Sequence, residues 1–397
     1  DYLSERARHS KEKFALHAVL NLGSLWPAAQ DELFDLAFEH ATADGRSVAI
    51  MHLVENGMPL SDKELEKLAR SKDPMISYEG RLARTARIED SEKLDKVLVK
   101  LAKSKSVVDR LVVGELLATK DLSTRFQILA AQLGDKDARV IRKAISSLER
   151  SRHKKAVEVF IAWLPSARPG EAFRISAALQ RLTGMMFGSQ FSGWKRWWSA
   201  EGENFEIPSS PGKPASPTQE HTSASFYGLP IYADRLVFAV DSSKSMNQPA
   251  GSGGKTRFEI SKSQISNAIE GLPKASAFEI VHFGKNAWSW NGGLVQAKPK
   301  SKRDALEYVH SISLSLGTAI YSAFRESFRD PQADSILFMT DGDPQLSLMQ
   351  NRSALQRIVA QWNRTRHMTI DCIAVGVDRA WLRKLAQQTG GRYSRVE

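Results

Sequence analysis

The chain has 397 residues, of which 42% are hydrophobic, so it can form two or three domains with well-packed cores. No stretch approaches the roughly 18 uninterrupted apolar residues that a membrane-spanning helix needs. The net charge of +11 is spread evenly, because residues 1–204 hold 33 Lys and Arg against 28 Asp and Glu, and residues 205–397 hold 23 against 17. Without a dense basic tract, this excess predicts a basic solvated surface and argues against nucleic acid as a partner.

Cysteine usage and the first residue bear on the compartment. The single cysteine, Cys372, excludes an internal disulfide, and its apolar neighbours predict a buried core residue. This usage is compatible with a reducing compartment but does not require one. The chain begins with Asp1 and not with Met, as a chain does after removal of a signal peptide. We therefore expect a periplasmic or extracellular protein in preference to a cytoplasmic one.

The first half of the chain predicts helices throughout. Its apolar residues recur at i, i+3, i+4 and i+7, and turn residues separate many of the segments. We expect helices near residues 11–22, 27–41, 46–56, 61–72, 74–86, 91–104, 106–118, 123–134, 136–150, 154–166, 169–184 and 190–203. Pairs of these helices recur with a period of about 31 residues, which indicates an α-solenoid.

One repeat carries a more specific pattern. Asp137, Val140, Ala144 and Leu148 follow the arrangement D-x-x-V-x-x-x-A-x-x-x-L, which resembles the first helix of a HEAT repeat. The resemblance implies an all-α HEAT-like solenoid over residues 1–204. A solenoid has an extended concave face and no obvious pocket for chemistry, so we expect this part to bind other proteins.

The composition changes after residue 204. Residues 208–225 contain Pro and Ser but no large apolar side chain, which predicts an extended linker, placed here at residues 205–227. From residue 228 strand and helix patterns alternate, which predicts a parallel sheet covered on both faces. We expect strands at 235–241, 278–283, 335–340, 369–376 and 392–396, helices at 256–271, 301–312, 318–328, 352–364 and 379–389, and one antiparallel edge strand beside the turn at Asn291.

Polar side chains follow the predicted strands where a ligand would bind. One apolar run ends in Asp241, with Ser243 and Ser245 after it, a second ends in Asp341, and Thr318 precedes a helix. Because ligands bind at the carboxyl ends of the strands in an open α/β sheet, we expect these side chains to converge. Hydroxyl and carboxylate oxygens are hard donors that suit Mg²⁺, Mn²⁺ or Ca²⁺ and not zinc.

The same five residues, in this order and on three separate elements, resemble the metal-ion-dependent adhesion site of von Willebrand factor A (VWA) domains. The resemblance covers residues 228–397 and implies an α/β doubly wound (Rossmann-like) fold. It also implies Mg²⁺, or alternatively Mn²⁺ or Ca²⁺, contacted directly by the hydroxyls and partly through water by the carboxylates. Few anionic ligands leave such an ion electrophilic, so it can take a Glu or Asp carboxylate from a partner protein. Helical repeats followed by this domain resemble a group of bacterial HEAT–VWA proteins.

Two further residues stand beside the predicted ligands. Lys244 occupies a position where the family usually has Gly. An exposed cation there would lower metal affinity by about 1 kcal/mol or less, or would help to recruit an acidic partner. Asp343 follows Asp341 by two residues and is either an outer group at the metal or only the acid of the turn.

Two alternatives come from other functional classes. Residues 249–256 nearly match the phosphate-binding pattern G-x-x-x-x-G-K-[ST], which would make the chain a Mg-ATP-binding ATPase. Against this, Pro249 replaces the first Gly, where the backbone must turn tightly, and the loop begins eight residues after Asp241. A basic solenoid that binds nucleic acid rests on charge alone. Because G-x-S-x-G, H-E-x-x-H and C-x-x-C are absent, we expect a non-enzymatic interaction protein.

Overall fold

The computed structural model describes residues 5, 7–8, 12–118, 125–209, 224–250, 254–345 and 347–397. Contacts divide the chain into two compact units. The sheet unit consists of Asp1–Glu79, Ser223–Ile231 and Arg235–Glu397, and the repeat unit consists of Gly80–Thr222 and Tyr232–Asp234. Most of the predicted linker lies outside the described residues, and the domain boundaries expected from composition stay a prediction.

The described chain is helical from residue 12 to residue 201, which confirms the predicted all-α first half. Its α-helices are α2 (Glu12–Leu22), α3 (Gln30–Glu39), α4 (Ala43–Glu55), α5 (Asp62–Ala69), α6 (Pro74–Ala86), α7 (Ser91–Ala102), α8 (Val107–Leu117), α9 (Phe126–Ala131), α10 (Ala138–Ser151), α11 (Lys154–Trp163), α12 (Pro169–Thr183) and α13 (Phe191–Glu201). Short 3₁₀ turns follow three of them, at η1 (Gly23–Leu25), η2 (Gln132–Gly134) and η3 (Leu164–Ser166). None of the described helices is both long and apolar enough to cross a membrane.

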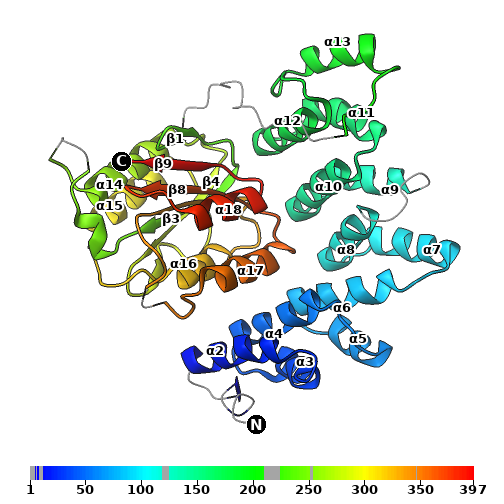
Figure 1. Ribbon diagram of the computed structural model, residues 1–397. Coiled ribbons are helices and arrows are strands. Elements are labelled where there is room, and N and C mark those ends of the chain that lie inside the picture. The colour runs from blue at the N-terminus through cyan, green and yellow to red at the C-terminus, as the bar shows by residue number, and fades with distance from the viewer. Residues whose placement is uncertain are drawn as a thin grey trace. The chain divides into compact units, whose positions relative to one another are not determined.

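The repeat unit stacks its helices in pairs (Figure 1). Helices α8, α10 and α12 form one row, and α7, α9 and α11 lie beside them as the second members of the pairs. Each pair buries its apolar stripe against its neighbours, as the sequence period predicts. In α10 the buried stripe includes Val140, Ala144 and Leu148, three of the residues in the predicted repeat pattern.

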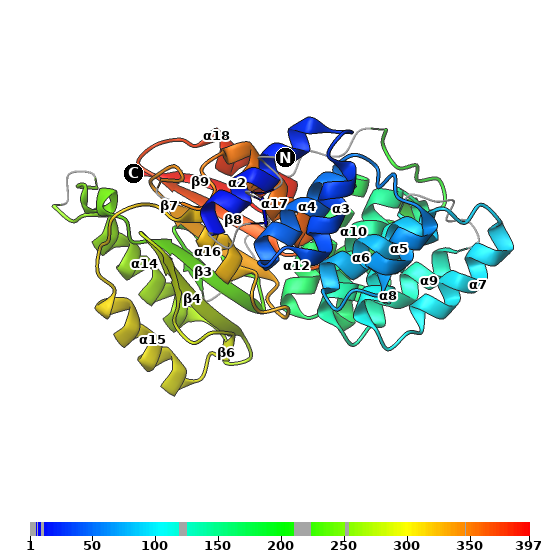
Figure 2. The same ribbon diagram turned by 90° about the horizontal axis from the view of Figure 1, so that it is seen from below.

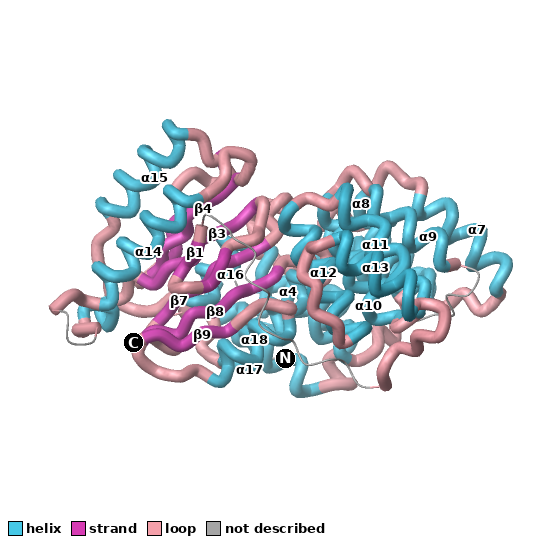
Figure 3. Tube along the Cα trace, turned by 90° about the horizontal axis from the view of Figure 1, so that it is seen from above, coloured by secondary structure: helices cyan, strands magenta, loops and turns pink. Residues whose placement is uncertain are grey.

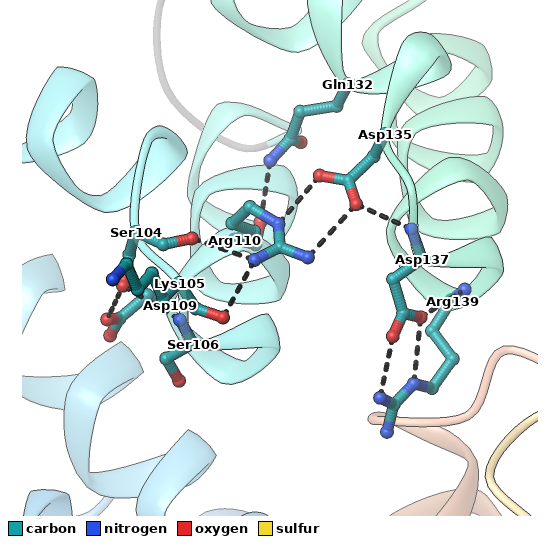
Figure 4. Close-up of polar contacts among 9 residues, drawn as sticks. All are labelled: Ser104, Lys105, Ser106, Asp109, Arg110, Gln132, Asp135, Asp137 and Arg139. Carbon is teal, nitrogen blue, oxygen red and sulfur yellow. Dashed lines mark hydrogen bonds and ion pairs between the residues drawn. The ribbon is translucent and has the colours of Figure 1, made fainter.

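Ion pairs link successive repeats, and the pair between Arg110 and Asp135 is buried. Arg110, on α8, is 4% exposed and donates to both oxygens of Asp135, which precedes α10, at 2.7 and 3.1 Å (Figure 4). The same guanidinium donates to the carbonyl of Ser104 at 2.8 Å, and Gln132 donates to the carbonyl of Arg110 at 2.7 Å. Further ion pairs about one repeat apart in sequence are Arg81–Asp109, Arg125–Asp95 and Arg181–Glu149. Because the buried guanidinium of Arg110 needs its partner, its pair with Asp135 fixes how one repeat docks on the next.

The sheet unit contains a seven-stranded sheet in the order β5-β4-β3-β7-β8-β9, with β6 also paired to β4. Its strands are β3 (Arg235–Asp241), β4 (Ala277–Phe283), β5 (Ala287–Ser289), β6 (Val295–Gln296), β7 (Ser335–Thr340), β8 (Thr369–Val375) and β9 (Tyr393–Val396). The long strands run parallel, while β5 and β6 pair antiparallel with β4 along one edge. The predicted parallel sheet with an antiparallel edge is confirmed. Before it, β1 (Ser225–Phe226) and β2 (Leu229–Pro230) form a small separate ribbon.

Helices cover both faces of this sheet, which explains why its central strands are apolar throughout. Helices α14 (Arg257–Gly271) and α15 (Pro299–Ser311) lie on one face (Figures 2 and 3). Helices α16 (Ile320–Ser327), α17 (Arg352–Asn363) and α18 (Ala380–Gln388) lie on the other. Every residue of β7 is buried, and Phe338 on β7 stacks with Phe283 at 5.4 Å and with Phe324 at 4.4 Å between ring centroids. Cys372, on β8, is fully buried, as its apolar context predicts.

The sheet unit also includes the first helices of the chain. On α4, Asp44 accepts from Arg325 at 2.9 Å, and Glu55 accepts from Arg357 on α17 at 2.7 Å. On α6, Glu79 is 2% exposed and binds both Gln361 of α17 and Arg364, the residue that follows α17. Polar and ionic contacts therefore fix these early helices to the helical layer that covers the sheet.

Candidate metal site

The predicted ligands Asp241 and Asp341 follow two neighbouring parallel strands at the same edge of the sheet. Asp241 is the last residue of β3 and is fully buried. Its Oδ1 accepts from the backbone N–H of Ser243 at 2.8 Å, and its Oδ2 accepts from the hydroxyl of Thr340, the last residue of β7. Thr340, which the sequence analysis did not single out, thus links the ends of the two strands.

The two serines join the carboxylates. The hydroxyls of Ser243 and Ser245 lie 3.0 Å apart, and Ser245 Oγ donates to Asp341 Oδ1 at 2.7 Å. Four of the five predicted donors, Asp241, Ser243, Ser245 and Asp341, therefore lie in one continuous hydrogen-bonded row.

Thr318 reaches the same edge from the loop before α16. Its backbone pairs with Gln345, donating at 2.8 Å and accepting at 3.2 Å. Its Oγ1 lies close to Gly342, the residue that follows Asp341, since a Cβ added to that glycine would be 3.5 Å from this oxygen. Thr318 is 4% exposed. The loop is anchored upstream as well, because Ser315 N–H donates to the carbonyl of Ser242 at 2.8 Å.

The electrostatics of this edge favour the gain of a positive charge. Burial raises the pKa of Asp241 to about 7, and the nearby charge of Asp341 acts in the same direction. Hydrogen bonds from Ser243 and Thr340 oppose the rise without cancelling it. A buried carboxylate with a raised pKa is relieved by a proton or by a cation.

The donor set fits a hard divalent cation. It combines two carboxylates with three hydroxyls, and each hydroxyl can donate its proton while its lone pairs face an ion. Within the described ranges, no three His, Cys, Asp or Glu side chains gather so that they could hold a metal. A metal at this edge would therefore depend on the hydroxyl donors, as in the predicted set.

Arg257, the first residue of α14, is a further charged group at this edge that sequence reasoning missed. Its Nη1 donates to Asp341 Oδ2 at 3.0 Å, and the Asp341 side chain is only 1% exposed. No local pattern could have revealed this contact, because 84 residues separate Arg257 from Asp341. The predicted ligand thus already carries one cationic partner.

The two residues predicted beside the ligands have different surroundings. Lys244 is exposed and opens the 3₁₀ turn η4 (Lys244–Asn247). Asp343 forms ion pairs with Arg352 at 2.6 Å and Arg379 at 2.8 Å, and it accepts from Trp381 Nε1 at 3.0 Å. Arg379 also donates to the carbonyl of Asp341 at 2.8 Å. Asp343 is therefore linked to Asp341 only indirectly, through Arg379.

The phosphate-loop alternative gains no support from the geometry. Thr256, which would contact Mg²⁺ in such a loop, caps α14. Its hydroxyl accepts from Glu259 N–H at 3.2 Å and donates to Glu259 Oε2 at 3.0 Å. Residues 251–253 of the predicted loop lie outside the described residues.

Comparison with known proteins agrees with the α/β fold of the second half of the chain. Residues 234–395 match the family model described as von Willebrand factor type A domain. Human von Willebrand factor A domain-containing protein 3B is 24% identical over 176 residues, which are 43% of this chain and 12% of that protein. Human inter-alpha-trypsin inhibitor heavy chain H4 is 26% identical over 183 residues, which are 43% of this chain and 19% of that protein.

Two solved structures are similar to part of this chain. A von Willebrand factor type A protein from Catenulispora acidiphila is 25% identical with a TM-score of 0.36, covering 41% of this chain and 38% of that one. The conserved hypothetical protein BatB from Bacteroides thetaiotaomicron is 21% identical with a TM-score of 0.32, covering 41% and 90%. The chain thus has an all-helical first part followed by a von Willebrand factor type A domain at residues 234–395. Domains of this family are typically protein-interaction modules without catalytic activity.

Proposed function

We propose that the von Willebrand factor type A domain at residues 234–395 is a metal-dependent interaction module that binds an acidic residue of a partner protein. The observation that supports this most is the row Asp241–Ser243–Ser245–Asp341, which gathers hard oxygen donors from two strand ends at one edge of the sheet. Thr318 completes the set from a third element.

Each residue would have a distinct part in holding Mg²⁺. Ser243, Ser245 and Thr318 would offer neutral hydroxyl oxygens, while Asp241 and Asp341 supply the negative charge. When bound, the ion supplies an electrophilic position that a carboxylate can take. Ser245 donates its hydroxyl proton to Asp341 and therefore accepts from Ser243, which leaves one lone pair of its oxygen to face the ion.

The surroundings of the site suit an acidic partner. Lys244 is exposed, and the Arg352 side chain is 54% exposed beside Asp343. Two exposed apolar residues stand on loops at the same edge, Leu316 just before Thr318 and Val377 just after β8. A partner segment that places Asp or Glu between apolar residues would match this arrangement, because cations steer it and apolar contacts hold it.

The repeat unit supports a second, separate binding role. Its period, its apolar stripes and the ion pairs between successive repeats support the proposal of a HEAT-like solenoid, which would offer an extended face to proteins. No feature of the described residues calls for catalysis, and the proposal is a non-enzymatic scaffold.

The experiment that tests the site is titration calorimetry of Mg²⁺, Mn²⁺ and Ca²⁺ into the metal-free chain. We expect one metal site that Asp241→Ala abolishes, and no binding of ATP in a parallel titration. Ser289→Ala, which removes a hydroxyl on β5 that hydrogen bonds Glu279 and Gly292, serves as the control and should leave metal binding unchanged. Absence of metal binding, or tight binding of Mg-ATP, would contradict the proposal.

A further inference from the structure

Arg257 contacts the proposed metal site although it has no place in the ligand set. It donates to Asp341 Oδ2 at 3.0 Å, while Ser245 donates to Asp341 Oδ1 at 2.7 Å. Both oxygens of this buried carboxylate are therefore engaged by the protein itself. A metal that needs charge from Asp341 must share the carboxylate with a guanidinium.

The backbone on two sides fixes the position of Arg257. Its N–H donates to the carbonyl of Gln248 at 3.0 Å, at the start of α14. Its guanidinium lies against Gly376, after β8, where φ is +79° and an added Cβ would stand 2.3 Å from Nη2. Only a glycine at position 376 accepts both that backbone conformation and that approach. The contact with Asp341 is thus built into the fold.

The charge balance of the site changes accordingly. Asp241 and Asp341 together bring two negative charges when ionised, and Arg257 returns one positive charge directly onto Asp341. Asp343 does not offset the positive charge of Arg257, because Arg352 and Arg379 already neutralise the Asp343 carboxylate. An arriving divalent ion therefore meets a cation at contact distance from one of its two anionic ligands, and the Asp341 side chain is only 1% exposed, so this charge acts on it strongly.

We propose that Arg257 is a built-in cation that competes with the divalent metal for Asp341 and so sets the metal affinity of the site. The proposal rests on the proposed metal site. Arg257 acts here through Asp341 as a positioning residue, and it keeps the carboxylate satisfied when no metal is bound.

The test is calorimetric titration of Mg²⁺ and Mn²⁺ into the full chain and three variants. Arg257→Gln removes the charge, and we expect it to bind metal at least about tenfold more tightly than the wild type. Arg257→Lys keeps the charge and should stay within about threefold of the wild type. Arg352→Gln removes a cation from Asp343 at the same edge and, as a matched control, should also stay within about threefold.

Each contrary result has its own meaning. Unchanged or weaker binding in Arg257→Gln, with binding abolished in Asp241→Ala, overturns the competition and leaves the proposed function standing. Equal tightening by Arg257→Gln and Arg257→Lys also overturns it, because the effect would then be one of packing. Failure of the wild type and Arg257→Gln to bind any metal overturns both proposals.

A measurement on the wild type avoids dependence on the folding of Arg257→Gln. Under competition, saturation with Mg²⁺ releases the guanidinium from Asp341. The Nη1–H resonance of Arg257, which comes from the group that donates to Asp341 and is assigned by its loss in Arg257→Lys, should then exchange faster with solvent. A resonance whose exchange is the same with and without Mg²⁺ overturns the inference.

Discussion

Glu79 offers the sharpest test of how the first helices belong to the sheet unit. It is 2% exposed, and it accepts from Gln361 Nε2, on α17, at 3.0 Å and from Arg364 Nη2, just after α17, at 3.1 Å. Arg364 Nε donates to the same carboxylate. Replacing Glu79 with Ala leaves Arg364 without its charge partner, and replacing Arg364 with Ala leaves a buried carboxylate held only by Gln361.

The magnitude follows from burial. Removing one partner of a buried ion pair lowers the free energy of unfolding by about 3 kcal/mol or more. Because the Arg364 side chain is 30% exposed, we expect each single variant to cost about 3 kcal/mol. Because the double variant leaves no orphaned charge, we expect it to cost about 4 kcal/mol. The coupling energy is then about 2 kcal/mol. The pair Glu55–Arg357, with side chains 36% and 40% exposed, is the matched control and should couple by less than about 1 kcal/mol.

The assay is native-state hydrogen exchange of the β7 amides in a double-mutant cycle. These amides are buried in the centre of the sheet and report the free energy of opening of the sheet unit alone, which avoids a two-state assumption for the whole chain. A coupling energy near zero for Glu79–Arg364, or one no larger than that of the control pair, would refute the reasoning.

Three further predictions concern other parts of the chain. Asp135→Ala leaves the buried Arg110 unpaired, so hydrogen exchange of the α8 amides should show a loss of about 3 kcal/mol or more, and a loss below about 1 kcal/mol would contradict this. Burial lowers the pKa of His52 and of His282 to about 4. Because the unfolded chain then binds more protons between about pH 4 and pH 6.5, stability should fall as pH falls through this window, by up to about 3 kcal/mol for each histidine. Thermal unfolding across that range checks this, and a wild-type profile no steeper than that of His52→Gln would count against it. Lys244→Gly should raise Mg²⁺ affinity by about fivefold or less, since an exposed charge acts weakly, and an unchanged dissociation constant in calorimetry would exclude an effect of this cation on metal binding.

The sequence was sufficient for those parts of the site that lie next to a periodic pattern. Apolar runs of strand length ending in Asp241 and Asp341 predicted both carboxylates at one edge, because parallel strands leave the sheet on the same side. Thr340 could have been found too, since it ends the second run, but a Thr inside a strand pattern reads as an ordinary β-branched residue. The helical first half followed from its 3.6-residue period, and the bounds differ from prediction by only a few residues at the helix ends.

Contacts between distant segments could not be predicted in this way. Arg257 follows a Gly-rich loop and looks like any exposed charge in the first turn of a helix, yet it contacts Asp341. Glu79 likewise occupies a charged position in a helix pattern, where a solvated side chain is the usual expectation, and its burial comes from α17, nearly three hundred residues later. The three-residue strand β5 is too short to show the alternation that identifies strands. Tertiary packing, and not local pattern, decides all three.

The measurement that tests the central claim most directly is the anomalous diffraction of a crystal of the full chain soaked in Mn²⁺. The account predicts one strong peak at the carboxyl edge of β3 and β7, within coordination distance of the hydroxyls of Ser243, Ser245 and Thr318. It also predicts that the peak is absent in crystals of Asp241→Ala. A peak at Asp343 or elsewhere on the surface, with this edge empty at saturating Mn²⁺, would contradict a metal-dependent interaction site.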